Sequence, residues 1–598
     1  MAVTGRGRSA TTNYPPLAMA GLVMLLLLAV MPSALNLPQT NPAETLEYAP
    51  IPPEDDQVTP PVGNLSSLGL GSSSSFGSSP GGGDPDLPPV EGGVRGVAKN
   101  PRVKNCVGNP PKQTEDALAP PCVGFYEGDN GGSTYLGVTR EEIRVLWYIE
   151  GGFTDCITSK GCEERPVSTY FDLGPAPKEG EEETYYVRQL RIWQRHFNDR
   201  YQTYNRSVHL FVYFTDGSNT VEGRRADAVE NLDRVKPFAV QTYVGNPDPY
   251  IEVMARRGVM NFGSFANKPA SYFARFPRLI WSYLPSIEQS AAMYSSLVCS
   301  QIVNRPVAFS GNPGDQGKPR KFGFLSTADP DFPGMQLFAR TAKEQIKKCG
   351  AEIVAEATAP YASYAQDTRT AGQEATQNVA KFVQAGVTTV LWAQGYETTH
   401  SNAAGQQNWR PEWVIAGDGY HEGYQTGKRQ DQSVWDHAWA MTNVVRAGLT
   451  SESYCYKAQR QDPASNHQDT NFDCGLTPLY KDLRQLFIGI QVAGPKLNPA
   501  TLDKGMHAIP AIRSDDPRVP ACFYNPGDYT CVKDAMVNWW DSRSNAPGAS
   551  DPGCWRMVDG GRRSFAGAWP EREASSTRTD ADPCSGYAGP LLLYAGTA

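Results

Sequence analysis

The sequence predicts an α/β protein whose parallel β-sheets form two lobes that face one cleft. Five short apolar runs each end in small, flexible or polar residues, and an amphipathic helical pattern lies near each run. The runs are Phe238–Tyr243, Val259–Phe262, Phe322–Leu325, Thr389–Trp392 and Val414–Ala416. Strands that alternate with helices are typical of parallel sheets, whose ligands bind at the carboxyl ends of the strands. These ends fall in two clusters, at 238–267 and 322–420, which predicts two Rossmann-like lobes.

The size and charge of the chain set the first limits on its class. A chain of 598 residues is too long for a single hydrophobic core and predicts at least two folded units. Hydrophobic residues make up 40% and charged residues 20%, as in soluble globular proteins. The formal net charge is -8 and no basic stripe occurs, so nucleic acid is not an expected partner.

The first 34 residues predict an export signal. Arg6 and Arg8 precede the apolar run Leu17–Met31, and the small residues of 32–34 follow it. A basic start, an apolar core and small residues before a cleavage point are typical of a secretory signal. The run also has about the minimum length of a membrane-spanning helix, so an uncleaved anchor is the alternative. The expected location is extracytoplasmic, either membrane-tethered or secreted.

Residues 35–134 predict a disordered linker that contains a loop closed by Cys106 and Cys122. The stretch from 35 to about 100 is rich in Gly, Ser and Pro and has few apolar residues to form a core. Chains of this composition stay extended or coiled. We therefore expect a tether that holds the folded part, which begins near Tyr135, clear of a membrane or cell-wall layer.

The first lobe, 135–284, is expected to alternate strands and helices. The expected elements are strand Ile143–Ile149, helix Thr184–Tyr201, strand Val208–Phe214, helix Val221–Val235, strand Phe238–Tyr243, helix Tyr250–Arg257 and strand Val259–Phe262. In the helix over 221–235, the residues predicted to share the apolar face are Val221, Ala228, Val229, Leu232 and Val235, and Arg225 is predicted to point to solvent.

The second lobe, 285–475, repeats this scheme after a capping box at Ser286 and Gln289. The further elements are strand Phe322–Leu325, helix Met335–Lys348, strand Ile353–Glu356, a helix ending before Gly386, and strands Thr389–Trp392 and Trp413–Ala416. A Cys-bearing insertion follows. In the last segment, 476–598, helix Leu479–Val492 returns to lobe 1. The remainder is rich in Cys, Trp and Gly and predicts an irregular Cys-rich C-terminal cap.

The twelve Cys residues are expected to form six structural disulfides between sequence neighbours. The simplest pairs are Cys106–Cys122, Cys156–Cys162, Cys299–Cys349, Cys455–Cys474, Cys522–Cys531 and Cys554–Cys584, although the sequence does not fix the connectivity. An even number of Cys fits export into an oxidising space. Neither Cys-x-x-Cys nor paired His at ligand spacing occurs, so no metal site is expected.

Enzyme signatures do not match when their spacing is checked. Gly311–Lys318 is similar to a phosphate-binding loop, but its glycine spacing differs and Pro319 replaces the hydroxyl residue. His421 and Glu422 lack the second His of a metalloprotease helix, and the folded region has no Gly-x-Ser-x-Gly elbow. A carboxylate pair brought together by the fold is the remaining enzyme alternative. We expect neither enzymatic activity nor a cofactor.

Six motifs follow one another in a characteristic order over about 135–510. They are Leu136–Val145 before the first strand, Asn261–Pro269 as a lobe-1 ligand loop, Asp329–Met335 as a turn into a lobe-2 helix, Leu391–Tyr396 and Ala416–Gly419 as lobe-2 loops, and Leu486–Lys504 as a helix pair returning to lobe 1. Together they resemble type I periplasmic binding proteins, the branched-chain amino-acid receptors of ABC transporters. The resemblance implies that family's fold, in which two lobes joined by a hinge close over a ligand.

The resemblance also implies which residues contact the ligand. Carried onto this sequence, they are Gly245, Asn246, Ser264 and Asn267 of lobe 1, and Phe332, Tyr396 and Asp418 of lobe 2. Donors at strand ends suit a carboxylate, the two aromatic side chains would cover the ligand, and Asp418 would pair with an amine. Each residue also has a structural alternative, because the Gly, Asn, Ser and Asp positions suit turns or caps and the aromatic residues suit packing.

One departure from the family pattern concerns the ligand. The family's amino-acid receptors carry a run of small hydroxyl residues in the first ligand loop, whereas Tyr243–Asp248 has none. This difference argues against an ordinary α-amino acid. We expect a monomeric solute-binding protein that captures a small polar molecule and delivers it to an ABC permease in the membrane. An extracellular ligand sensor or interaction module with the same fold is the alternative.

Overall fold

The computed structural model describes residues 106–572 and 584–585, apart from a set of gaps. The gaps are 109, 114, 125, 151–168, 175, 179–184, 217–219, 245–246, 264–267, 328–331, 360–367, 394–398, 418–423, 437, 444–453, 463–476, 513–518, 548 and 558. All described residues belong to one of the chain's two units, Pro80–Ala598. The predicted export signal and the tether to about residue 100 lie outside the described residues. Among the helices described, none is long and apolar enough to cross a membrane.

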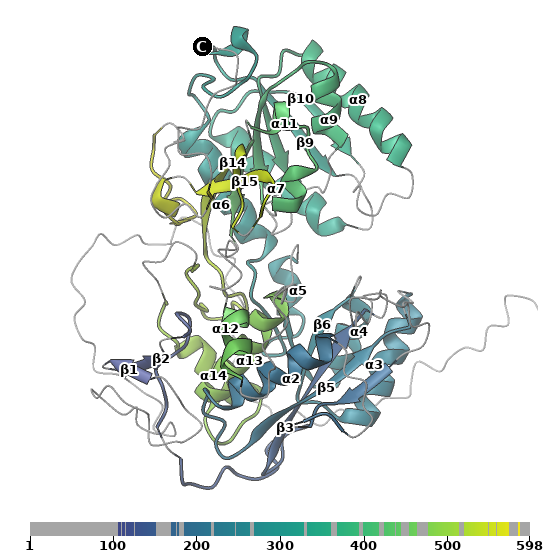
Figure 1. The fold of residues 1–598 in the computed structure, drawn as a ribbon, viewed down its shortest axis with the longest axis vertical. Helices are drawn as coiled ribbons and strands as arrows, with labels where there is room; N and C mark the ends of the chain where they lie inside the picture. Colours follow the sequence, from purple (N-terminus) through teal and green to yellow (C-terminus); the bar gives the residue numbers. More distant parts are fainter. Residues whose placement is uncertain are drawn as a thin grey trace, which may run out of the picture. The chain divides into compact units, whose positions relative to one another are not determined.

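The first lobe is built on a six-stranded sheet (Figure 1). In spatial order its strands are β4 (Thr169–Asp172), β5 (Ser207–Phe214), β3 (Glu142–Ile149), β6 (Ala239–Tyr243), β7 (Met260–Gly263) and β8 (Ile280–Ser282). Neighbouring strands are parallel except for β4, which runs antiparallel to β5. Along the parallel part, the spatial order β5-β3-β6-β7-β8 means that the winding reverses between β3 and β6.

Helices cover both faces of the first sheet. They are α2 (Tyr185–Asn198), α3 (Val221–Val235), α4 (Asp248–Arg256), α5 (Ala270–Ala274), α13 (Thr477–Ala493) and α14 (Pro499–Ala508). Trp147 of β3 packs with residues of α2 and α13 in one core, while Tyr148 packs with residues of α3 and α4 in the other. The limits predicted for α3 are confirmed, but the prediction that Val221 and Val229 lie on its apolar face was wrong, because both side chains are exposed. Thr220 caps its first turn by accepting a hydrogen bond from the Gly223 amide, and Lys236 ends it in a left-handed conformation.

The second lobe has an eight-stranded sheet with the same winding. In spatial order its main strands are β10 (Ile353–Ala359), β9 (Phe322–Thr327), β11 (Thr389–Ala393), β12 (Glu412–Ala416), β13 (Ala438–Thr442), β14 (Asp534–Asn545) and β15 (Pro552–Met557), and β16 (Ser564–Phe565) pairs with β14. The strands from β10 to β13 are parallel, and the winding reverses between β9 and β11. The predicted fold class, two lobes with parallel sheets, is therefore confirmed.

The helices of the second lobe also lie on both faces of its sheet. They are α6 (Ile287–Gln301), α7 (Pro333–Lys348), α8 (Thr368–Gln384), α9 (Thr399–Gln406), α10 (Tyr424–Lys428) and α11 (Gln432–Trp435). The cores of the two faces contain residues of α6 and α7 on one side and of α8, α9 and α11 on the other. The predicted capping box at the start of α6 is present, with Ser286 and Gln289 each bonding the other's backbone N–H.

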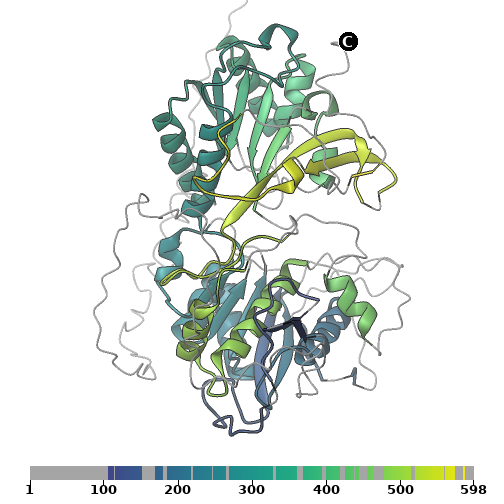
Figure 2. The same ribbon diagram turned by 90° about the vertical axis from the view of Figure 1, so that its left-hand side faces the viewer.

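The predicted C-terminal cap is not confirmed, because much of the last segment extends the second sheet. Strand β14 runs antiparallel to β13, and β15 runs antiparallel to β14 (Figure 2). Asp541 of β14 and Arg556 of β15 form an ion pair of 3.0 Å, and both side chains are almost completely buried. These buried charges interrupt the apolar pattern that would otherwise indicate a strand.

The predicted linker also differs from the structure over its last part. The described residues of 106–134, which we call the N-terminal strap, pack on the first lobe. The strap begins with an antiparallel hairpin of β1 (Cys106–Gly108) and β2 (Pro111–Gln113). Further along, Leu118 and Ala119 belong to the first-lobe core. The folded part of the chain therefore begins before Tyr135.

A segment assigned by sequence to the second lobe packs on the first. Helix α12 (Tyr454–Gln461) lies within 285–475, yet Cys455 and Ala458 are buried in the first-lobe core. Just beyond the helix, the Asp462 carboxylate accepts two hydrogen bonds of 2.8 Å from Arg195 of α2. The first lobe therefore contains residues from before position 475 as well as from 135–284.

Four of the six predicted disulfides are present among the described residues. They are Cys106–Cys122, Cys299–Cys349, Cys522–Cys531 and Cys554–Cys584. Cys455 is also in a disulfide, but its predicted partner Cys474 lies outside the described residues, as do Cys156 and Cys162. Disulfides of this number fit an oxidising, extracytoplasmic compartment.

Gly137 allows the segment before β3 to lie against the backbone before β6. It has a φ of +70°, and a Cβ added there would lie 2.2 Å from the Phe238 nitrogen. We expect Gly137→Ala to lower the free energy of unfolding by about 2–4 kcal/mol, because strain and overlap with backbone add together. Gly317→Ala is the matched control, since Gly317 has a φ of +75° with no atom within 4 Å. Equal losses for the two variants in urea unfolding would contradict this explanation.

Candidate ligand-binding site

The five apolar runs named by the sequence are parallel strands, and each ends close to its predicted position. They correspond to β6, β7, β9, β11 and β12. Six of the seven predicted ligand residues lie outside the described residues, namely Gly245, Asn246, Ser264, Asn267, Tyr396 and Asp418. Phe332 is described, as are the residues that flank each loop. These flanking residues show which charges, hydrogen bonds and aromatic contacts are present at the strand-end edge of each sheet.

Several of the predicted residues follow strands at the two reversals of winding. In the first sheet, residues 245 and 246 follow β6, one of the two strands at the reversal. In the second sheet, Phe332 follows β9 and Tyr396 follows β11, the two strands at that reversal. The crevice of a doubly wound sheet opens at this position, where neighbouring loops go to opposite faces. The strands that precede these positions therefore lie at the reversals of winding in the two sheets.

Phe332 stands at the N-terminus of α7. It is half-buried and packs against Met335, whose side chain is buried. The two side chains form a small apolar cluster that is separate from the two main cores of the second lobe. The placement just beyond β9 agrees with a residue at the strand-end edge, and packing against Met335 is the structural alternative that the sequence leaves open.

The first-lobe edge carries a buried ion pair at the end of the central strand. Glu150 directly follows β3, and Arg224 of α3 donates to its carboxylate at 2.7 Å. The Arg224 side chain is fully buried and also donates to the Tyr148 hydroxyl at 3.0 Å. The carboxylate at this strand end therefore already has a cationic partner within the protein.

Tyrosine hydroxyls surround a second carboxylate beside the same strands. Asp227 accepts hydrogen bonds from Tyr148 at 2.5 Å and from Tyr213 at 3.0 Å. Burial raises the pKa of Asp227 above its ordinary value, although these two hydrogen bonds oppose the rise. Tyr148 also stacks on Tyr250, with ring centroids 3.8 Å apart. This side of the edge is consequently a rigid aromatic and hydrogen-bonded layer.

A third carboxylate, which is paired with a cation, lies beside β6 and β7. The Lys268 ammonium contacts the Asp248 carboxylate at 2.6 Å, and the Tyr272 hydroxyl donates to the same carboxylate at 3.2 Å. At the end of β6, Tyr243 is half-buried, and burial followed by the nearby Tyr186 raises its pKa. The raised pKa keeps the Tyr243 hydroxyl protonated at neutral pH, so it can donate as well as accept hydrogen bonds.

On the second lobe, His400 lies near the strand-end edge at the start of α9. Burial lowers its pKa to about 3, so the imidazole is neutral at physiological pH. Its Nε2 lies 3.2 Å from the Asn378 amide nitrogen, and its ring packs 6.1 Å from that of Trp392. His400 is therefore a core residue rather than a charged contact for a ligand.

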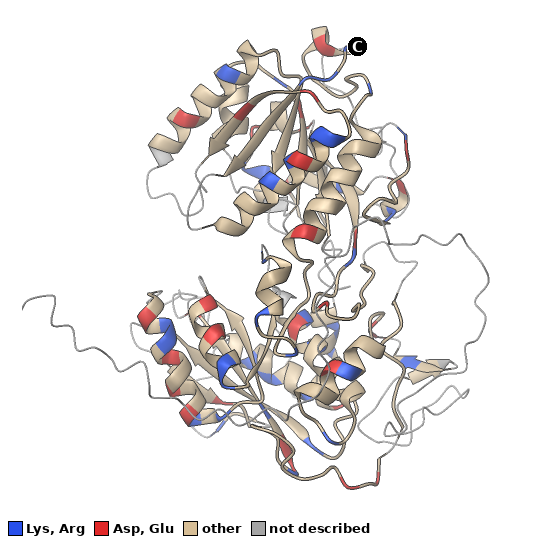
Figure 3. Cartoon of the chain, turned by 180° about the vertical axis from the view of Figure 1, so that it is seen from behind, with Lys and Arg blue, Asp and Glu red and all other residues tan. Residues whose placement is uncertain are grey.

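Acidic and basic residues are interspersed along the helices of both lobes (Figure 3). On α7, for example, Lys343 and Lys347 both contact Glu356 of β10. On α4, Arg256 pairs with Glu252, which also contacts Arg275. Such pairs leave little field of a single sign over these helices.

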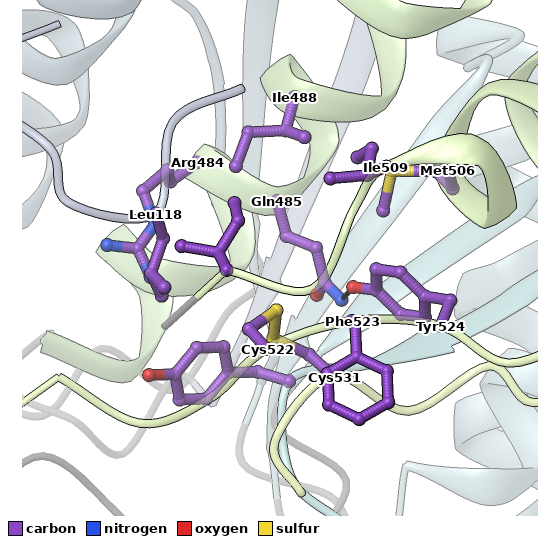
Figure 4. A pocket seen from close by; sticks show the side chains of 12 residues that line it. Leu118, Arg484, Gln485, Ile488, Met506, Ile509, Cys522, Phe523, Tyr524 and Cys531 are labelled. Carbon is purple, nitrogen blue, oxygen red and sulfur yellow. Dashed lines mark hydrogen bonds between the residues drawn. A yellow bond between two sulfur atoms is a disulfide. The ribbon is translucent and has the colours of Figure 1, made fainter. Parts of the chain in front are cut away.

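A small cavity lies within the first lobe (Figure 4). It has a volume of about 20 Å³ and lies between α13, α14 and the segment that includes the Cys522–Cys531 disulfide. Gln485 points from α13 toward Tyr524 and donates a hydrogen bond to its hydroxyl. A cavity of this size holds about one water molecule, so it is too small for a solute.

The other chemical alternatives also fail within the described residues. No group of three or more His, Cys, Asp or Glu side chains is placed there to hold a metal ion. The segment Gly311–Lys318 contains a short 3-10 turn at Pro313–Asp315 before β9. It therefore precedes its strand, whereas a phosphate-binding loop joins the end of a strand to a helix.

Solved structures similar to this chain are solute-binding proteins, the class that the sequence resembles. One is an ABC-transporter solute-binding protein from R. palustris in complex with 4-hydroxybenzoate, with 9% identity, a TM-score of 0.48, and coverage of 72% of this chain and 98% of that chain. Another is a periplasmic binding protein from Burkholderia mallei, with 11% identity, a TM-score of 0.44, and coverage of 74% and 99%. A third is a substrate-binding protein from Desulfitobacterium hafniense in complex with Leu, with 11% identity, a TM-score of 0.41, and coverage of 69% and 99%. Neither a protein-family model nor a curated protein sequence matches the chain.

Proposed function

We propose that this protein is an extracytoplasmic solute-binding protein that captures a small polar molecule between its lobes and delivers it to an ABC permease. The observation that carries the proposal is the pair of doubly wound sheets within one unit of the chain. All seven predicted ligand residues come after carboxyl ends of strands in these sheets, where doubly wound folds bind ligands. Two lobes that close over a solute need no chemical step, because closure itself gives the permease a shape to recognise.

The described edge of the first lobe suggests which groups bind the charged part of the solute and which bind the rest. Glu150 and Asp248 are each paired with a cation of the protein, so neither carboxylate needs a charged ligand for compensation. Charge recognition would then fall to the strand-end loops, where Asp418 is the predicted partner of an amine. Backbone amides and hydroxyls near residues 245–246 and 264–267 would bind the uncharged or anionic part of the solute.

A screen with purified protein tests the proposal. Amino acids, amides, peptides and sugars are offered singly, and the melting temperature is measured. A true ligand stabilises the folded state by mass action, by about 2.7 kcal/mol at a concentration one hundred times its Kd. A screen in which no compound raises the melting temperature would contradict the proposal.

For a ligand that carries an amine, we expect Asp418→Asn to weaken binding by about tenfold to a hundredfold, because a charge-assisted hydrogen bond is lost. Isothermal titration measures this change directly. Asp129→Asn is the matched control, since Asp129 of the strap forms an exposed ion pair with Arg140. An unchanged Kd for Asp418→Asn would remove Asp418 from the site.

Cell-based uptake separates transport from the sensor alternative. Deletion of the protein should abolish uptake of the compound found in the screen, and the wild-type chain should restore it. If uptake stays normal while a cellular response to the compound disappears, the protein is a sensor instead.

A further inference from the structure

The chain passes between the two lobes in segments that are bonded to one another. One segment joins β8 to α6, and another leads from Ile512 to β14. Around Ser282 the two run side by side, since the Ser282 amide donates to the Tyr529 carbonyl at 2.8 Å and the Cys531 amide donates to the Ser282 carbonyl at 2.9 Å. The Val532 amide adds a bond of 3.1 Å to the Tyr283 carbonyl. The two segments therefore lie side by side as a two-stranded parallel ribbon, which we call the crossing.

One side chain ties this ribbon to the first helix of the second lobe. The Gln289 Oε1 atom accepts from the Ser286 amide at 2.9 Å, which completes the capping box of α6. The Thr530 hydroxyl oxygen lies 2.9 Å from the same atom, and the Gln289 Nε2 atom donates to the Asp528 carboxylate at 2.9 Å. Gln289 therefore belongs to the helix cap and to the crossing at once.

Asp528, on the crossing, contacts residues of the crossing itself and a residue of the first lobe. The Lys533 ammonium contacts the Asp528 carboxylate at 2.9 Å, and the Lys533 side chain is largely buried. The Thr530 hydroxyl oxygen also lies 2.6 Å from the Asp528 carboxylate, so its single proton is donated either to this carboxylate or to the Gln289 Oε1 atom. From the first lobe, the His507 Nε2 atom of α14 lies 3.2 Å from the Asp528 carbonyl oxygen. A continuous set of polar contacts thus leads from α14 through the crossing to α6.

We propose that Gln289, Asp528, Thr530 and Lys533 form an interlobe clasp that sets the balance between lobe orientations, and with it the affinity for the solute. The proposal rests on the proposed function insofar as it concerns a solute. Bending between the lobes changes the backbone near residues 283–286, and the Gln289 contacts span that stretch. A ligand shifts such an equilibrium only by its differential affinity for the two states. The clasp sets the population ratio of the two states before the ligand binds, and the apparent affinity for the ligand depends on that ratio.

The experiment measures lobe orientation in the ligand-free protein. Dyes are attached at positions 229 on α3 and 383 on α8, whose valine side chains are 47% and 44% exposed, and single-molecule energy transfer gives the distance distribution. Gln289→Leu and Thr530→Val are compared with the wild type. Thr530→Val keeps the capping box intact, so a change in it cannot come from fraying of α6. Each variant is expected to change the population ratio on the order of tenfold.

Gln301→Leu is the matched control, because Gln301 is a buried glutamine at the other end of α6. Its distribution should match that of the wild type. Unchanged ratios in both Gln289→Leu and Thr530→Val would overturn the clasp, as would an equal change in Gln301→Leu. No ligand is present in this experiment, so its result does not depend on the solute screen. A changed population ratio supports the clasp even if the screen finds no ligand. An unchanged ratio rules out the clasp even if the screen finds one.

Discussion

Replacing Glu412 by glutamine is expected to lower the free energy of unfolding of the second lobe by about 3–5 kcal/mol. The Glu412 side chain is fully buried, and its carboxylate accepts bonds of 2.7 Å and 2.9 Å from the buried guanidinium of Arg320. It also accepts from the amides of Ala308 and Phe309 and from the Thr389 hydroxyl. A glutamine oxygen can still accept from the two amides, so the loss should come mainly from leaving Arg320 buried without a counter-charge.

Tryptophan fluorescence during urea unfolding measures this loss, because the second lobe contains a core of six tryptophans. They are Trp392, Trp409, Trp413, Trp435, Trp540 and Trp555. Arg320→Met should cost a similar amount, and the double variant should cost less than the sum, because the two residues act as one pair. Removal of the exposed Arg140–Asp129 pair should lower the free energy of unfolding only slightly, because solvent screens exposed charges. A loss of that small size for Glu412→Gln would contradict the buried-pair account.

Replacing Asp116 by asparagine is expected to lower the free energy of unfolding of the first lobe by about 3–5 kcal/mol and to release the strap. Asp116 is buried and accepts from Arg484 at 3.2 Å and from the Tyr201 hydroxyl at 2.8 Å. Burial alone would lower the pKa of Arg484, but Asp116 and the nearby tyrosines hold it above its ordinary value. Without the carboxylate, a buried guanidinium loses its counter-charge.

Hydrogen exchange of residues 106–134 is the direct measurement for this variant. Exchange should accelerate throughout the strap, whereas the hairpin closed by Cys106 and Cys122 keeps its covalent link. Asp129→Asn is the control within the same segment, because Asp129 and Arg140 are 71% and 63% exposed. Equal protection of the strap in the wild type and in Asp116→Asn would show that the ion pair does not hold it.

The regular elements of the two lobes could be predicted from sequence because local signals and burial agree there. The run Thr389–Trp392 is apolar after its first residue and becomes a fully buried strand, and the Ser286 capping box marks the start of α6. The strap gives no such signal, because the burial of Asp116 depends on Arg484, which lies 368 positions away. Strands β14 and β15 were not predicted for a related reason. Their charged residues Asp541 and Arg556 are buried as an ion pair, and this pair forms only when the two strands lie side by side.

The candidate site also has a part that could be predicted from sequence and a part that could not. The strand ends were predictable from where apolar runs stop, and the strand order of both sheets gives four of the seven positions a place at a reversal of winding. The pairing of Glu150 with Arg224 was not predictable, because it joins two segments whose contact depends on the fold. The ligand roles of the seven residues stay predictions, and six of those residues lie outside the described part of the chain.

A crystal structure of the protein with a compound from the thermal screen tests the central claim most directly. The account predicts density for the compound at the carboxyl ends of the strands, in contact with the loops that contain Asn246 and Asp418. A compound bound elsewhere, for example only beside Gln485 and Tyr524, would contradict solute capture between the lobes.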